Sequence, residues 1–146
     1  MQPVFQTDFS AAHGNALQAC FATIFALDLN DVPNFIRAGA DYLAAVDAWL
    51  APRGLAFVKI NLAATNGRLE FPAGPALCVL AGPSPRGDYK HAVVARVHAS
   101  GDVQIGRDFE IVHDPHPDGR GLAGAPVWAG FVVLRAADPD RSQPWP

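Results

Sequence analysis

The sequence has 146 residues, half of them hydrophobic and 17% charged, which is typical of a globular protein and excludes a disordered one. The formal net charge is −3 and the basic residues are scattered singly, which argues against nucleic-acid binding. No apolar run is long enough to span a membrane, and no signal-peptide pattern precedes the first elements. We therefore expect a single domain over residues 1–137 with a Pro-rich tail at 138–146. We expect no nucleic-acid or membrane partner, and a location in the cytoplasm of a bacterial or phage-infected cell.

Helical periodicity occupies the first part of the chain. Apolar residues over Leu17–Leu27 recur with the spacing of one wide helix face, which predicts a helix from Ala16 to Asp28–Asn30. Asn15 precedes this helix and is suited to cap it, because its side chain can accept hydrogen bonds from first-turn amides. A second amphipathic helix is expected over Ala40–Leu50.

Strand signals follow the helices. A loop is expected over Ala63–Gly74, and a Gly/Pro-rich connection over Pro83–Gly87. Because helices and strands are segregated along the chain, we predict an α+β fold with N-terminal helices packed on an antiparallel β-sheet. The strands are expected at Leu55–Leu62, Pro75–Leu80, His91–His98, Val103–Ile105, Glu110–His113 and Val127–Leu134.

Two cysteines, Cys20 and Cys78, lie inside apolar runs. Free cysteine is among the most buried residue types, so we expect both to be buried thiols. Cys20 is disfavoured as a nucleophile, because it lies one turn inside the predicted helix, where the amides are already paired.

Three features that are distant in the sequence have the chemistry of a cysteine nucleophile site. A loop meets a helix at Ala16, His91 begins a predicted strand, and Asp114 directly follows another. A helix N-terminus stabilises a thiolate, an imidazole beside it serves as base, and a carboxylate fixes the imidazole tautomer. If neighbouring antiparallel strands bring His91 and Asp114 to one sheet edge, only the sulfur is missing, because residue 16 is alanine.

The segment Gly14–Cys20, Gly-Asn-Ala-Leu-Gln-Ala-Cys, is followed by Leu27–Phe35, Leu-Asp-Leu-Asn-Asp-Val-Pro-Asn-Phe. Together they resemble small bacterial and phage papain-like proteins, and are similar to the bacteriocin-leader peptidase domains of double-glycine ABC transporters. That family has a Gln, a spacer, Asp or Asn, Cys, two residues, Ala and Cys. It later has a His followed by apolar strand residues, and then Asp-Pro. His91-Ala92-Val93-Val94 and Asp114-Pro115 look like these last two motifs.

The resemblance implies a papain-like fold and a Cys-His-Asp triad that cleaves a peptide or amide bond in a peptide or protein-tail substrate. It places the nucleophilic cysteine at position 16, the general base and acid at His91, and the orienting carboxylate at Asp114. It makes Gln6 the side-chain donor of the oxyanion hole, with the backbone amide of residue 16 as the second donor. No cofactor or metal is implied. The spacer after Gln6 is longer than is usual in the superfamily, and Gln18 is the fallback donor.

Alanine at position 16 has two interpretations. We interpret Ala16 as an engineered Cys-to-Ala change, made to trap a substrate or to stop self-cleavage, in an otherwise intact peptidase or isopeptidase site. The alternative is a natural pseudopeptidase that binds peptides without cleaving them. Amidase, deamidase or transacylase chemistry is compatible with the same triad.

A metal site is a further alternative. His113, Asp114 and His116, with His91, have the side chains of zinc ligands. Successive strand residues point to opposite faces of a sheet, which disfavours a chelate of this kind, so we expect no metal. His116 is then a residue that lines the substrate groove, and His13 a loop residue.

Overall fold

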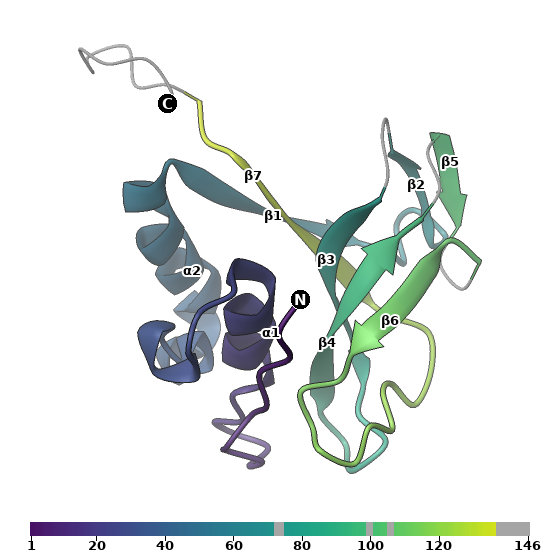
Figure 1. The fold of residues 1–146 in the computed structure, drawn as a ribbon. Coiled ribbons are helices and arrows are strands. Elements are labelled where there is room, and N and C mark those ends of the chain that lie inside the picture. Colours follow the sequence, from purple (N-terminus) through teal and green to yellow (C-terminus); the bar gives the residue numbers. More distant parts are fainter. Residues whose placement is uncertain (72–74, 99–100, 105–106, 137–146) are drawn as a thin grey trace.

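The structure is a computed structural model, and it describes residues 1–71, 75–98, 101–104 and 107–136. Two helices pack against a five-stranded antiparallel sheet, so the predicted α+β class is confirmed (Figure 1). The predicted tail at 138–146 lies outside the described residues. Within them, no helix has the length and apolar character needed to cross a membrane.

The first helix, α1 (Ala16–Phe25), begins at the predicted residue. It ends sooner than predicted, because Ala26 adopts a left-handed conformation and the Leu27 N–H donates to the Ala22 carbonyl. The apolar run continues into the 3-10 turn η1 (Leu29–Asp31) instead of extending the helix. Cys20 and its neighbours on α1 are fully buried, as the periodicity predicts.

The second helix, α2 (Tyr42–Leu50), follows the 3-10 segment η2 (Phe35–Asp41). Gly39 has a φ of 62°, which interrupts the helical backbone and moves the start of α2 beyond the predicted Ala40. A last 3-10 turn, η3 (Ala51–Arg53), leads into the sheet.

The main sheet has the strand order β1-β7-β3-β4-β6, and every neighbouring pair is antiparallel. A separate two-stranded sheet joins β2 to β5. The prediction of a loop over residues 63–74 is wrong for β2, whose pairing partner β5 is distant in the sequence. The strands are β1 (Leu55–Asn61), β2 (Arg68–Phe71), β3 (Ala76–Pro83), β4 (Lys90–Val97), β5 (Gly101–Gln104), β6 (Phe109–His113) and β7 (Trp128–Leu134).

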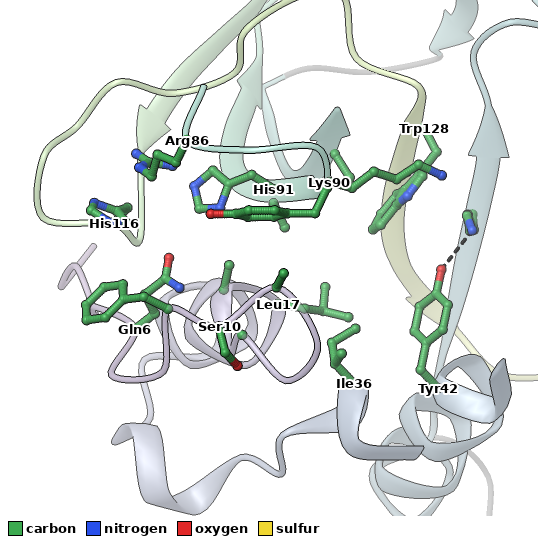
Figure 2. A pocket seen from close by; sticks show the side chains of 18 residues that line it. Gln6, Ser10, Leu17, Ile36, Tyr42, Arg86, Lys90, His91, His116 and Trp128 are labelled. Carbon is green, nitrogen blue, oxygen red and sulfur yellow. Dashed lines mark hydrogen bonds between the residues drawn. The ribbon is translucent and has the colours of Figure 1, made fainter. Parts of the chain in front are cut away.

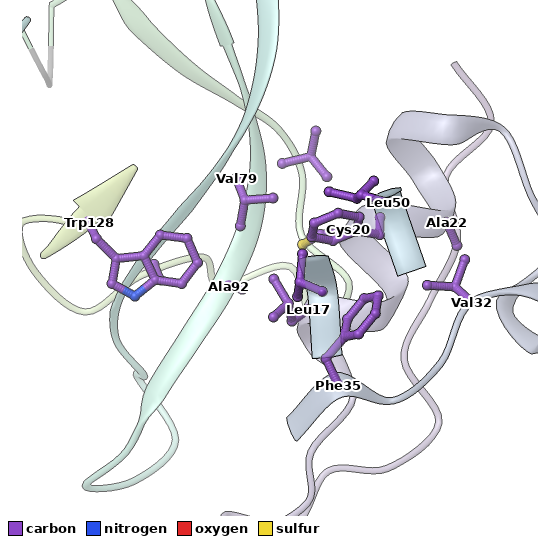
Figure 3. Packing of buried hydrophobic residues seen from close by; sticks show 13 residues of the cluster. Leu17, Cys20, Ala22, Val32, Phe35, Leu50, Val79, Ala92 and Trp128 are labelled. Atoms are coloured by element: carbon purple, nitrogen blue, oxygen red, sulfur yellow. The ribbon is translucent and has the colours of Figure 1, made fainter. Parts of the chain in front are cut away.

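Buried side chains alternate along β3 and divide the core between the two faces of the main sheet. Val79 belongs to the cluster under the helices, whereas Cys78 and Leu80 belong to a second cluster. Helix α1 packs on β3 and β4, and α2 packs on β1 (Figure 1). Figure 3 shows side chains of the cluster under the helices. Both cysteines are buried free thiols, as predicted. Burial raises the pKa of the Cys78 thiol to about 12, and it raises the pKa of the Cys20 thiol strongly.

The positions of β4 and β6 define the candidate site. These strands are antiparallel neighbours, so the beginning of β4 and the end of β6 lie at the same end of the sheet. Helix α1 packs on β4, and the N-terminus of α1 lies at this same end of the sheet (Figure 1).

Candidate active site

A cleft of about 280 Å³ separates the N-terminus of α1 from the beginning of β4 (Figure 2). Its lining includes Gln6, Ala16 and His91, which were predicted to belong to one site, together with His116. His116 therefore lies in the groove where it was expected, and its ring packs against Phe9. Gln6 and His116 lie at one end of the cleft in Figure 2.

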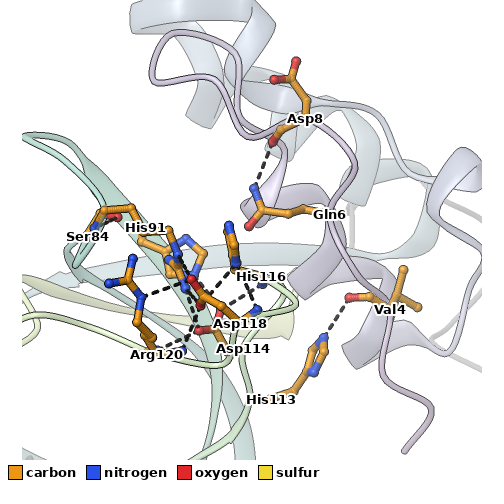
Figure 4. Close-up of polar contacts among 12 residues, drawn as sticks. Val4, Gln6, Asp8, Ser84, His91, His113, Asp114, His116, Asp118 and Arg120 are labelled. Atoms are coloured by element: carbon orange, nitrogen blue, oxygen red, sulfur yellow. Dashed lines mark hydrogen bonds and ion pairs between the residues drawn. The ribbon is translucent and has the colours of Figure 1, made fainter.

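His91 and Asp114 form a direct contact at the end of the sheet where β4 begins and β6 ends. The distance from His91 Nε2 to Asp114 Oδ1 is 2.7 Å, and both side chains are about 5% exposed (Figure 4). Because an ionised carboxylate can only accept, the Nε2 atom carries the proton. The Nδ1 atom is then the basic nitrogen of the neutral ring, and the Asp114 contact leaves it free for a group in the cleft.

Asp114 is held by three further donors. Its Oδ1 accepts the His116 amide at 2.9 Å, while its Oδ2 accepts the Gly121 amide at 2.7 Å and Arg86 Nη2 at 3.2 Å. Burial alone would raise the pKa of this carboxyl, but the bonds from His91 and the two amides outweigh burial and lower the pKa to about 2. Asp114 is therefore a fixed anion at neutral pH.

Arg86 links Asp114 to a second carboxylate, Asp118. Its Nε donates to Asp118 Oδ2 at 2.9 Å, and its Nη2 contacts Asp118 Oδ1. Hydrogen bonding to Arg86 is the largest influence on Asp118 and holds its pKa well below the usual range. Arg86 was not expected from the sequence to be a site residue. The only signal was a lone arginine in the Gly/Pro-rich segment that precedes His91.

Gln6 is brought to the cleft by the extended N-terminal segment. Its backbone N–H donates to the Pro115 carbonyl at 3.0 Å, and its side-chain Nε2 donates to the Asp8 carbonyl at 2.9 Å. The Oε1 atom is buried without a hydrogen-bond partner among the described residues. The bond to a carbonyl identifies Nε2 as the nitrogen, and an amide nitrogen has a second N–H that can donate elsewhere.

Asn15 is at the N-cap of α1, but its side chain makes no capping bond, so the predicted capping interaction is wrong. Its Oδ1 instead accepts the backbone amides of Thr7 and Asp8, at 2.9 and 2.8 Å. Amides of the loop before the helix, and not those of the helix, therefore donate to this oxygen. The first-turn amides of α1 therefore have no side-chain cap, and Ala16 lies among them in the wall of the cleft.

Gln18 is not an alternative oxyanion donor, so the fallback assignment is wrong. Its Nε2 donates to the carbonyls of Leu29 and Val32, at 2.8 and 2.6 Å, and its Oε1 accepts from Asn15. The side chain is buried and fixes the turn after α1 to the helix.

The histidines considered for a metal site are separated. His113 Nε2 lies 2.7 Å from the Val4 carbonyl, outside the cleft that His91 and His116 line. Across the described ranges, no group of three or more His, Cys, Asp or Glu side chains is arranged to hold a metal ion. His13 is exposed in the loop before α1.

Comparison with known proteins gives no match to a family model, a curated protein or a solved structure.

Proposed function

We propose that this chain is a papain-like cysteine peptidase or isopeptidase domain in which Ala16 occupies the nucleophile position. In this form it holds a peptide or protein-tail substrate in the cleft without cleaving it. The observation that carries the proposal is that His91, paired with the buried Asp114, lines the same cleft as the uncapped first turn of α1. A thiol at position 16 would share the cleft with the basic Nδ1 atom of His91, and Asp114 is the fixed anion that orients the His91 ring. The thiol would also lie at the first turn of α1, whose backbone amides have no side-chain cap.

The chemistry follows from these positions. The thiolate attacks the amide carbonyl carbon, and the resulting oxyanion accepts hydrogen bonds from the residue 16 amide and from Gln6 Nε2. The His91 imidazolium then protonates the leaving nitrogen as the C–N bond breaks, which leaves a thioester. Next, His91 takes a proton from water, the water oxygen attacks the thioester carbonyl, and the C–S bond breaks. The thiolate is regenerated as the carboxylic acid leaves.

The fold supports a papain-like arrangement. The proposed nucleophile position begins the helix that packs on β3 and β4, whereas the base and its carboxylate come from the adjoining ends of β4 and β6. Helix and sheet thus contribute opposite walls of one cleft (Figure 2).

A natural pseudopeptidase is the second candidate, and Ala16 itself favours it. Against it stands the local structure around Asp114, where three donors hold one buried carboxylate that also contacts His91. A cleft that only binds peptide has no need for an oriented imidazole. Amidase, deamidase and transacylase reactions use the same attack and differ in the amine that leaves or in the acceptor.

The proposal is tested by restoring the thiol. Ala16→Cys is treated with acetyl-Leu-Ala-Ala chloromethyl ketone, and alkylation is followed by intact mass. We expect rapid modification at one site. The parent chain is a built-in control, because Cys20 and Cys78 are buried. Ala44→Cys, on the exposed surface of α2, gives the rate of an ordinary thiol. The proposal fails if His91→Ala and Asp114→Ala, each combined with Ala16→Cys, are alkylated as fast as Ala16→Cys alone.

A further inference from the structure

We infer that the Trp128 end of the cleft is a carboxylate-binding subsite formed by Lys59 and Lys90. The inference rests on the proposed function and names the substrate class: a peptide with a carboxylate group near the amide bond that lies against His91. The carboxylate is either the α-carboxylate of a chain end or an Asp or Glu side chain. Both have the same chemistry, and the experiment below separates them.

The distribution of lysine in the chain is the first observation. The sequence contains only two lysines, and both line this cleft. None of the described residues that line it is Asp or Glu, although the whole chain has a formal net charge of −3. The third lining cation, Arg86, is already paired with Asp114 and Asp118. Lys59 and Lys90 therefore make this part of the cleft positive on an otherwise acidic protein.

Lys59 is held in position by aromatic groups. Its Nζ donates to Tyr42 Oη at 2.7 Å and lies 5.3 and 5.2 Å from the ring centroids of Tyr42 and Trp128. An ammonium has three donors, so two remain after the bond to the phenol. A cation that is already ordered loses less side-chain entropy when it binds an anion.

Lys90 approaches the same end from β4, which is separated from β1 in the sheet by β7 and β3. It immediately precedes His91 at the beginning of β4, and in Figure 2 its side chain extends toward Trp128. No ion pair joins Lys59 or Lys90 to a carboxylate in the part of the chain that the structure describes. Both ammonium groups are thus available to a ligand.

The surroundings favour a carboxylate attached to an apolar or peptide backbone. Leu17, Ile36 and the Trp128 ring form the apolar wall of this end of the cleft (Figure 2). Two ammonium groups beside apolar surface suit a single carboxylate whose carbon chain contacts that surface. In an unmodified peptide substrate, carboxylates are the only anionic groups that can occupy it.

The test uses the parent chain and three peptides with one backbone. Acetyl-Ala-Leu-Ala-Glu-amide has only a side-chain carboxylate, acetyl-Ala-Leu-Ala-Gln with a free C-terminus has only an α-carboxylate, and acetyl-Ala-Leu-Ala-Gln-amide has neither. Protein labelled with [ε-13C]lysine gives two assignable resonances, because the sequence has two lysines. We expect both lysine resonances to shift when at least one of the two charged peptides is added. The protein should bind that peptide about tenfold more tightly than the neutral peptide.

Variants assign the effect to the two lysines. Lys59→Gln and Lys90→Gln should each reduce the affinity for the charged peptide by about threefold, and Lys→Arg at either position should restore it. Arg37→Gln, an exposed residue outside the lining, removes the same charge and should have no effect. Equal affinity for all three peptides, or equal affinity in the Gln variants and the parent chain, would overturn the inference.

This outcome is independent of the test of the proposed function. Peptide binding is measured in the parent chain, which has alanine at position 16 and cannot form the acyl-enzyme, whereas thiol reactivity is measured in Ala16→Cys. Selective binding of charged peptides with an unreactive introduced thiol would contradict the peptidase proposal alone. A reactive thiol that depends on His91, without preference for a carboxylate, would contradict the subsite alone.

Discussion

The side-chain oxygen of Asn15 accepts the backbone N–H of Asp8 at 2.8 Å, so the residue at the N-cap of α1 stabilises the preceding loop and not its own helix. The backbone reinforces this contact, because the Asn15 N–H donates to the Asp8 carbonyl at 3.1 Å. The same carbonyl accepts Gln6 Nε2. The loop residue Asp8 thus connects Asn15, which directly precedes the proposed nucleophile position at the start of α1, to Gln6, the proposed oxyanion donor.

Replacement of Asn15 by alanine should therefore destabilise the protein and loosen the loop. The buried side chain accepts two backbone amides and donates to Thr7 and Gln18, so its loss leaves several polar groups without partners. We expect a loss of about 1–3 kcal/mol in the free energy of unfolding, measured by urea denaturation. Asn30→Ala, at an exposed position in η1, is the matched control and should change stability by less than about 0.5 kcal/mol. Equal stability of the two variants would contradict the anchoring role.

Acid should weaken the fold through Asp114. Its folded-state pKa of about 2 lies below the ordinary value of 3.8, so folding favours the ionised carboxylate. The stabilisation is complete above about pH 5 and is lost as the pH falls through 4 toward 2. It amounts to about 2 kcal/mol. Urea denaturation between pH 2 and 6 should show this loss in the parent chain.

Asp114→Asn isolates that contribution. The variant should be less stable at pH 6, and its stability should fall less steeply below pH 5 than that of the parent chain. Asp88→Asn, an exposed carboxylate outside the Asp114 network, should retain the parent's pH dependence. If Asp114→Asn loses stability with acid as steeply as the parent chain, the pairing with His91 and the two amides does not stabilise the folded carboxylate.

Gly130 allows the close packing of β7 against Phe57 on β1. A Cβ atom at Gly130 would lie 2.1 Å from Phe57 Cζ, and the Phe57 ring is itself packed against Phe21 and Trp128. Gly130→Ala should lower the free energy of unfolding by about 1–3 kcal/mol, because the ring has to move within a packed cluster. Gly124→Ala is the matched control, since its nearest contact would be Pro83 Cγ at an ordinary 3.6 Å. Similar urea midpoints for the two variants would contradict this packing argument.

Local patterns were sufficient to predict the helix at Ala16, the strands of the main sheet and the two buried thiols. Each depends on periodicity or on apolar neighbours in the sequence. His91 and Asp114 could be paired in advance because each lies at the end of a strand with strong signals. Their contact then required only that β4 and β6 be neighbours.

The remaining features depend on contacts between distant segments. Strand β2 was missed because its partner β5 lies far along the chain, and the end of β3 was missed because Gly82 pairs with His91. The predicted cap was wrong for a related reason. The backbone amides of Thr7 and Asp8 donate to the Asn15 side chain in place of the helix amides, and this preference depends on how the loop folds back onto the helix. Lys59 and Lys90 lie 31 positions apart in the sequence, and only the fold brings both into the lining of one cleft.

The pH profile of a thiol restored by Ala16→Cys tests the electrostatics of the proposed site most directly. The helix N-terminus and a protonated His91 both favour a thiolate, so the introduced thiol should have a pKa below its ordinary value, within roughly 3.5–7.5. Its alkylation by iodoacetamide should therefore stay fast at pH 6. Alkylation of Ala44→Cys, on the exposed surface of α2, should be slow at pH 6, because an ordinary thiol has a pKa of about 8.5. Adding His91→Ala should move the profile of the restored thiol toward that of Ala44→Cys. Coincident profiles with and without His91 would show that the imidazole does not interact with position 16.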